Sequence, residues 1–310
     1  MAEKTGIAWT RSTFNPWIGC TKVGPGCDHC YAEALDKRMR FGGGEHWGSG
    51  VERLHTSFAT WKEPLKWNAR AARGERPWRV FCASLADVFD NEVPAQWRSE
   101  LWALVARCSH LDWLIVTKRI GNVRSMVPQE WLHGFPRSVR LLITVCNQEE
   151  ADRDVPKLLA LPCKNGVSYE PALGPVDWLI AMSGGCDKHG YRKPLLTDRK
   201  IDWIICGGES TQGAGKSRPF DLAWARNTIA QCKAAAVPVF CKQLGSNAQE
   251  IAYPTNVGES EKARWHADGW TSIHEEASTH WRKYYRLKDR AGADPAEWPE
   301  DLRVQEFATT

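Results

Sequence analysis

The sequence predicts an α/β fold: a partial or complete parallel (β/α) barrel with insertions and a C-terminal appendage. Two observations lead to this prediction. Short apolar runs recur along the chain and end in small or polar residues, which is typical of buried parallel strands. Segments with the apolar spacing of helices separate these runs, and strands that alternate with helices form parallel sheets.

The composition indicates an ordinary globular protein. Of 310 residues, 43% are hydrophobic and 25% are charged, which excludes disorder as the main state. No run approaches the roughly 20 apolar residues that cross a bilayer, and the start of the chain shows no apolar stretch behind its charges. We therefore expect a cytoplasmic protein with no membrane partner. A net charge of +4 allows an anionic partner without requiring one.

The first expected strand, near Ile7 to Trp9, is weak. Six stronger strands follow it, over Val80 to Ala83, Trp113 to Val116, Leu141 to Val145, Gly166 to Ser168, Trp203 to Cys206 and Val239 to Cys241. Helical spacing covers Gln96 to Cys108, Gln148 to Leu161 and Phe220 to Ala236.

Three stretches do not follow this alternation. They are residues 42–79, residues 183–200 and the tail from Ser246. We therefore expect a barrel over residues 1–245 with insertions near 42–79 and 183–200. Residues 246–310 would form an appendage packed on the barrel. Its mixture of aromatic and basic residues is compatible with packing or with contact to nucleic acid.

Polar residues follow the expected strands, and in parallel α/β folds the chemistry lies at the carboxyl ends of the strands. Any one of these residues is also typical of a helix cap or a solvated loop. Together they predict a shared cavity. They are Ser84, Asp87, Lys118, Asn147, Glu170, Glu209, Lys242 and Gln243.

Eleven cysteines, an odd number in a chain of this size, indicate free thiols or metal ligation rather than disulfides. Cys20, Cys27 and Cys30 have the spacing C-x6-C-x2-C. Turn-forming residues Lys22 to Gly26 let the three thiols approach one another, and a helix is expected over Tyr31 to Met39. This segment is the main candidate for a metal site.

Thiolates bind zinc or iron-sulfur clusters. Structural zinc normally has four protein ligands, whereas three thiolates leave one position of a cluster open. His29 is poorly placed to be a fourth ligand, but Cys186, near His189, could close a zinc site or belong to a second metal site. Structural zinc, an open cluster and buried free thiols therefore all remain possible. Buried thiols are expected for Cys82, Cys146, Cys206 and Cys241, and core positions for Cys108, Cys163 and Cys232.

Several motifs together resemble one family. From about Ile7 to Val304, the chain is similar to the phage-associated three-cysteine-motif family of radical-SAM-like proteins. The segments that carry the resemblance are Phe14 to Glu33, Ser84 to Phe89, Leu114 to Arg119, Ser168 to Pro171, Asp202 to Ser210 and Trp298 to Val304.

The resemblance implies a barrel of the radical SAM type that binds a 4Fe-4S cluster through Cys20, Cys27 and Cys30. S-adenosylmethionine would bind the open iron and yield a 5′-deoxyadenosyl radical, with an external electron donor as partner. Tyr31 would lie near the adenine. The six-residue first gap departs from the common C-x3-C-x2-C spacing.

The same resemblance implies further site residues. In many radical SAM enzymes the glycines that meet the methionine amino group follow the second strand, whereas Gly207, Gly208 and Glu209 follow a late one. Ser84 and Asp87, which follow the second expected strand, could take that part instead. Thr144 and Asn147 would bond the ribose, and Glu170 or Lys242 would face the substrate.

The expected function is phage DNA hypermodification, namely rearrangement of an amino-acid substituent on a modified pyrimidine such as thymidine. Two alternatives are a radical SAM enzyme acting on a peptide or small molecule, and a non-catalytic zinc-containing module that binds nucleic acid. Salt-dependent affinity for DNA would favour a DNA or nucleotide substrate over a peptide or small molecule.

Overall fold

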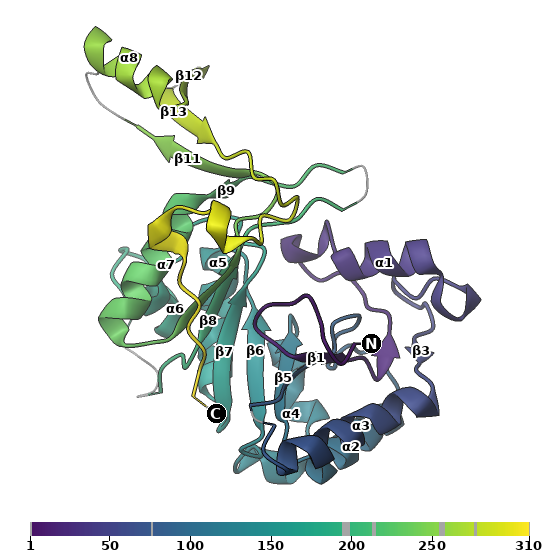
Figure 1. Cartoon of the computed structure of the whole chain (residues 1–310). Helices are drawn as coiled ribbons and strands as arrows, with labels where there is room; N and C mark the ends of the chain where they lie inside the picture. The colour runs from purple at the N-terminus through teal and green to yellow at the C-terminus, as the bar shows by residue number, and fades with distance from the viewer. Residues whose placement is uncertain are drawn as a thin grey trace.

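The computed structural model describes residues 2–75, 77–193, 199–212, 215–253, 258–275 and 278–309. Seven parallel strands form one curved sheet, so the fold is an α/β partial barrel, as predicted (Figure 1). Its order is β1 (Ser12–Phe14), β4 (Arg79–Cys82), β5 (Asp112–Thr117), β6 (Val139–Thr144), β7 (Lys164–Tyr169), β8 (Ile204–Gly207) and β10 (Val239–Gln243). Because β1 and β10 are the two edges of this sheet, the barrel is open between them.

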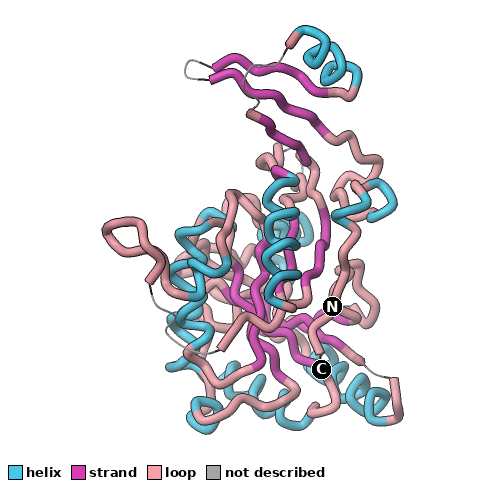
Figure 2. The backbone as a smooth tube through the Cα atoms, turned by 90° about the vertical axis from the view of Figure 1, so that its left-hand side faces the viewer, coloured by secondary structure: helices cyan, strands magenta, loops and turns pink. Residues whose placement is uncertain are grey.

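Helices pack around the sheet and bury a continuous apolar layer against it (Figure 2). They are α2 (Phe58–Ala72), α3 (Ala95–Arg107), α4 (Val123–Met126), α5 (Gln148–Leu159), α6 (Trp178–Met182) and α7 (Leu222–Ala235). The six stronger strands and the helices expected between them are confirmed. The helix α2 connects the parallel neighbours β1 and β4, so part of residues 42–79 belongs to the β/α alternation.

The expected first strand at Ile7 to Trp9 is wrong, because these residues form a turn and the first strand begins at Ser12. Trp9 is buried on the inner side of the sheet, at 2% exposure. The apolar signal of this segment therefore reflects burial in the barrel interior rather than strand pairing. The cluster around Trp9 contains Leu114, Leu142, Trp203, Ile205, Phe240 and Ala308.

The end of the chain covers the β10 edge of the sheet. The amide of Cys241 donates to the carbonyl of Val304 at 2.8 Å, and the amide of Glu306 donates to the carbonyl of Val239 at 2.9 Å. These bonds satisfy backbone groups that an edge strand would otherwise expose. Part of the tail after Ser246 is thus bound to the barrel.

Residues 248–284 of the tail, apart from those not described, form an arm that projects from the barrel, whereas Trp298 and Leu302 pack in the main core (Figures 1 and 2). Its four-stranded sheet has the order β12 (Trp270–Glu275), β13 (Ser278–Tyr284), β11 (Ala248–Ala252) and β9 (Phe220–Asp221), and α8 (Glu259–Ala267) adjoins it. Trp265 of α8 lies 5.2 Å from Trp281 and 5.0 Å from Trp270, measured between ring centroids. These aromatic side chains pack within the arm.

Two short strands and a helix lie near the start of the chain. β2 (Trp17–Ile18) pairs with β3 (Leu54–His55), and α1 (Tyr31–Met39) has the bounds expected from the sequence.

The end of β8 packs tightly against the segment that follows β10. A Cβ on Gly208 would lie 2.4 Å from the carbonyl oxygen of Leu244 and 2.8 Å from the ring of Phe220. A Cβ on Gly245, whose φ is +77°, would lie 2.6 Å from the carbonyl oxygen of Glu209. Close backbone approach therefore explains glycine at position 208.

We expect Gly208→Ala to lower the free energy of unfolding by about 1–3 kcal/mol, because the added methyl group overpacks this contact. Urea unfolding followed by circular dichroism measures the change. Gly121→Ala is the control, since a Cβ there meets no atom within 4 Å. Equal effects of the two substitutions would contradict this explanation.

Candidate functional site

The three cysteines of the C-x6-C-x2-C segment line one cavity of about 110 Å³ at the carboxyl ends of the strands. Four of the residues expected to bind cofactor line it as well, and they come from separate parts of the chain. The lining includes Cys20, Cys27, Cys30, Tyr31, Ser84, Asp87, Thr144, Lys118 and Arg119.

The strands and the loop before Cys20 assemble this cavity. Val116 of β5 and Thr144 of β6 belong to the inward-facing set of their strands, because side chains alternate between the two faces of a sheet. The amide of Gly19 donates to the carbonyl of Leu85 at 3.0 Å. Cys20 is thereby held beside the segment that follows β4.

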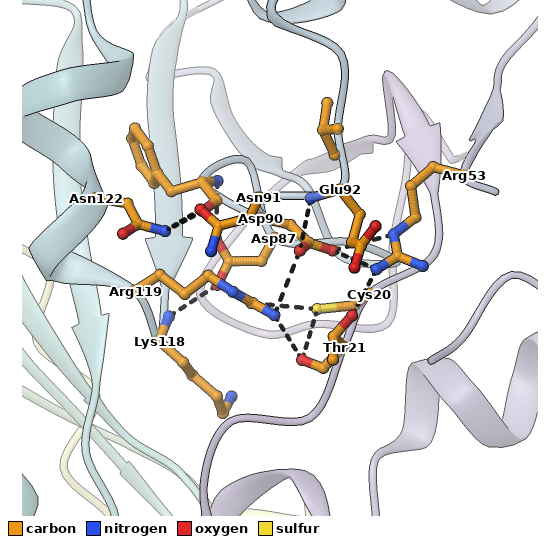
Figure 3. Close-up of polar contacts among 12 residues, drawn as sticks. Cys20, Thr21, Arg53, Asp87, Asp90, Asn91, Glu92, Lys118, Arg119 and Asn122 are labelled. Carbon is orange, nitrogen blue, oxygen red and sulfur yellow. Dashed lines mark hydrogen bonds and ion pairs between the residues drawn. The ribbon is translucent and has the colours of Figure 1, made fainter. Parts of the chain in front are cut away.

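A buried ion network surrounds Cys20 (Figure 3). The Arg119 guanidinium donates from Nη1 to the Cys20 sulfur at 3.4 Å and to the Asp87 carboxylate at 3.1 Å. Asp87 also accepts from the Thr117 hydroxyl at 2.8 Å and from the Lys118 amide at 2.9 Å. Its carboxylate therefore orients the Arg119 side chain and the backbone that follows β5, rather than being free for a ligand.

A second arginine fixes the residue after Cys20. Arg53 is buried, bonds Asp90 at 3.0 Å, and donates to the Thr21 hydroxyl at 2.6 Å (Figure 3). Arg119 donates to the Thr21 carbonyl at 2.5 Å. The sequence did not indicate Arg53, which lies in a stretch expected to be an insertion, because its role depends on contacts distant in sequence.

Burial and nearby charges shift the pKa of two groups that line the cavity, Cys20 and Lys118. Burial, with the nearby Asp87 charge, raises the pKa of Cys20 to about 12, so this thiol is protonated in the metal-free protein. Burial would lower the pKa of Lys118, but its acidic neighbours, Cys27 first and Asp87 among them, outweigh that effect and raise it. Metal binding at Cys20 must therefore release a proton.

The remaining thiols are placed by glycine and by a helix. A Cβ on Gly26 would lie 2.5 Å from the Cys146 sulfur, so only glycine lets the loop pack on β6's carboxyl end. Cys30 is the N-cap residue of α1, where unpaired amides carry partial positive charge. Cys82, Cys146, Cys206 and Cys241 are buried and unpaired, as predicted.

Glu209 contacts the cysteine segment instead of lining the cavity. Its carboxylate bonds Nδ1 of His29 at 2.7 Å and the Arg218 side chain at 2.6 Å. Burial would raise the pKa of Glu209, but the bonds from Arg218 and His29 outweigh it and hold that pKa below its ordinary value.

Several other expected site residues lie outside the cavity lining. The Asn147 side chain caps α5 by accepting from the Glu150 amide at 3.0 Å. Gly207 packs against Glu170 and Gln243, and Gly208 packs against Leu244, which follows β10. These three positions have structural roles that account for their residue types.

The two expected catalytic residues do meet each other. Lys242 Nζ lies 3.1 Å from Glu170 Oε1, and the pair joins the carboxyl ends of β10 and β7. Both side chains are largely buried, at 25% and 12% exposure. Such a pair can hold or move a proton beside a bound substrate.

The donor set of the cavity fits an iron-sulfur cluster. Within the described residues, no three His, Cys, Asp or Glu side chains are grouped so that they could hold one metal ion, and this includes Cys186 and His189. Three thiols around one cavity, with the cations Lys118 and Arg119 beside them, are a donor set that fits a 4Fe-4S cluster with one open iron.

One protein family matches most of this chain. Residues 4–293 match the family described as "Protein of unknown function (DUF5131)". No curated protein matches the chain significantly. In the part of the chain that the structure describes, no helix has the length and apolar character needed to cross a membrane.

Solved structures of spore photoproduct lyase resemble this chain at low identity. One variant of that enzyme is 11% identical with a TM-score of 0.42, and the match covers 94% of this chain and 72% of that one. Another variant, with bound AdoMet and dinucleoside spore photoproduct, is 9% identical with a TM-score of 0.41 over the same shares.

We expect Asp87→Asn to lower the free energy of unfolding by about 3 kcal/mol, because it removes the nearer of the two carboxylates that pair with the buried Arg119 and leaves only Asp90 at 3.7 Å. Denaturant unfolding measures the loss. Asp301→Asn is the matched control: Asp301 also pairs with an arginine but is 53% exposed. It should cost less than about 1 kcal/mol. A loss at Asp87 no greater than at Asp301 would refute this role.

Proposed function

We propose that this chain, which belongs to the DUF5131 family of proteins of unknown function, is a radical S-adenosylmethionine enzyme that modifies a nucleobase. One observation carries the proposal: Cys20, Cys27 and Cys30 line a single cavity with two cations at the carboxyl ends of a parallel, open barrel. Three thiolates are the ligand set of a 4Fe-4S cluster with one open iron.

When bound, such a cluster supplies the electron that cleaves S-adenosylmethionine into methionine and a 5′-deoxyadenosyl radical. Cys20, Cys27 and Cys30 would hold it. Lys118 and Arg119 would offset its negative charge, and the Arg119 bond to the Cys20 sulfur would raise its reduction potential. The cavity walls would exclude water from the reaction.

Three residues of the cavity are proposed to orient S-adenosylmethionine. The Tyr31 hydroxyl donates to the Ser84 carbonyl at 2.6 Å, which fixes the ring at the cavity wall beside the expected adenine. The Ser84 hydroxyl is bonded to Asn15 at 3.1 Å. Among the described residues the Thr144 hydroxyl has no such partner, so it is the better candidate to bond the ribose.

For the substrate we propose a modified pyrimidine of phage DNA, on the strength of the family resemblance in the sequence. The reaction would be an isomerisation that moves an amino-acid substituent from a nitrogen to a carbon linkage, so no atoms are gained or lost. Glu170 and Lys242 would face this substrate, since their ion pair lies at strand ends of the same barrel.

Anaerobic reconstitution with iron and sulfide tests the cofactor. We expect about four iron atoms per chain in the parent protein, and a loss of most of them in Cys27→Ala, because each thiolate binds its own iron. Iron analysis, electron paramagnetic resonance after reduction, and detection of 5′-deoxyadenosine are the measurements. Cys108→Ala is the control, since Cys108 is a buried core thiol outside the cavity.

Stoichiometric zinc in place of iron would overturn the proposal in favour of a zinc-containing binding module. A parent protein that forms 5′-deoxyadenosine but changes no nucleoside in modified phage DNA would retain the radical class and refute the substrate.

We expect Lys242→Gln to reduce turnover of modified DNA by at least about tenfold while iron content stays at the parent level, because the ion pair lies outside the cysteine-lined cavity. Nucleoside mass spectrometry measures turnover. Glu170→Gln should behave alike, because the two groups form one pair. Loss of iron in either variant would contradict a role toward substrate.

A further inference from the structure

The cysteine segment lies across the mouth of an open barrel, and its two ends are attached to different strands. Cys20 is held by Arg119, which follows β5. The far end, residues 25–29, is held by Glu209 and Arg218, which follow β8. The segment thus links parts of the barrel that are not neighbours in the sheet.

Glu209 is the centre of the far attachment. Its side chain is only 6% exposed, and its carboxylate accepts from Nδ1 of His29 at 2.7 Å. It accepts from Arg218 three times: from the backbone amide at 2.8 Å, from Nη2 at 2.6 Å and from Nε at 3.2 Å. The carboxylate is therefore fully occupied by protein donors.

Arg218 also contacts the loop directly. Its Nη1 donates to the Pro25 carbonyl at 2.9 Å and to the Asp28 carboxylate at 3.2 Å. Glu209 and Arg218 together thus contact the loop at Pro25, Asp28 and His29, immediately beside Cys27 and between Cys27 and Cys30.

The loop has little order of its own. Gly24 and Gly26 lie within it, and glycine loses more conformational entropy on ordering than any other residue. Its internal backbone bonds are those of one short turn, in which Cys27 donates to Gly24 and Asp28 donates to Pro25. A loop of this kind takes one conformation only if outside contacts hold it.

We propose that Glu209 and Arg218 are positioning residues that form a clamp on residues 25–29 and fix the Cys27 and Cys30 thiols before metal binds. This inference rests on the proposed function only for the identity of the group that these thiols bind. The clamp itself acts in the metal-free chain. Glu209 then positions the cysteine loop, while the preceding Gly208 allows the close contact between the end of β8 and the segment after β10.

Hydrogen exchange of the metal-free full chain tests the clamp. In Glu209→Gln we expect amides of residues 26–31 to exchange at least about tenfold faster, with unchanged exchange in the barrel strands. Alkylation of Cys27 and Cys30 should accelerate in parallel. Glu250→Gln is the matched control, because Glu250 is also a largely buried carboxylate that bonds an arginine, Arg226, but it lies in the arm.

Arg218→Lys keeps the charge but loses the planar fork, so it should also accelerate exchange of the loop. If Glu209→Gln does not fold, His29→Ala is the milder variant, since it removes one bond from a half-exposed side chain and leaves the Glu209–Arg218 pair intact. We expect it to accelerate loop exchange by about threefold.

Reconstituted protein gives a second readout that global destabilisation alone would not give. Glu209→Gln should release iron to a chelator at least about tenfold faster than Glu250→Gln at equal global stability. Unchanged loop exchange in a folded Glu209→Gln protein would overturn the clamp. Faster loop exchange in a protein that binds no iron would support the clamp and refute the proposed function.

Discussion

The buried carboxylate of Asp87 is the interaction on which the candidate site depends. It lies after β4, accepts from Thr117 and Lys118 at the end of β5, and pairs with Arg119, which in turn bonds the Cys20 sulfur. One charge therefore fixes two adjacent strand ends and the first cysteine. Because the same carboxylate pairs with Arg119 and accepts from the end of β5, the cation at the thiol and the geometry of the strand ends are maintained together.

The open barrel explains why the cysteine segment needs attachments on both sides. Strand pairing holds neighbouring strands together, but β1 and β10 are edges, so no ladder fixes the width of the mouth between them. Apolar packing around Trp9 fills the inner side of the sheet. At the carboxyl ends polar contacts replace that packing, with Arg119 at one end of the cysteine segment and Glu209 with Arg218 at the other. The site is therefore built by charged hydrogen bonds on a rigid apolar base.

The sequence predicted the elements better than the contacts between them. Strand ends could be predicted because a buried apolar run stops where polar residues begin, and this placed Ser84, Asp87 and Thr144 at one cavity. The turn at Trp9 was mistaken for a strand because burial inside the barrel gives the same apolar signal as pairing.

The roles of Arg53, Arg218 and His29 had no local signal. Their partners lie tens to hundreds of residues away, so only the folded chain brings them together. Gly208 is the opposite case, because its sequence context suggested a role in ligand binding. In the structure, glycine is needed there because the backbone at Leu244 approaches too closely for a side chain.

Both ends of the chain take part in closing the same apolar interior. Trp9 and Ala308 belong to one buried cluster, and residues 304–306 cover the β10 edge. Until residues 304–306 bind there, β10 has an unpaired strand edge. Contacts of such long sequence separation form late and slowly, and an unpaired edge is prone to intermolecular pairing meanwhile. A folding intermediate that lacks these contacts therefore aggregates more readily than the complete fold.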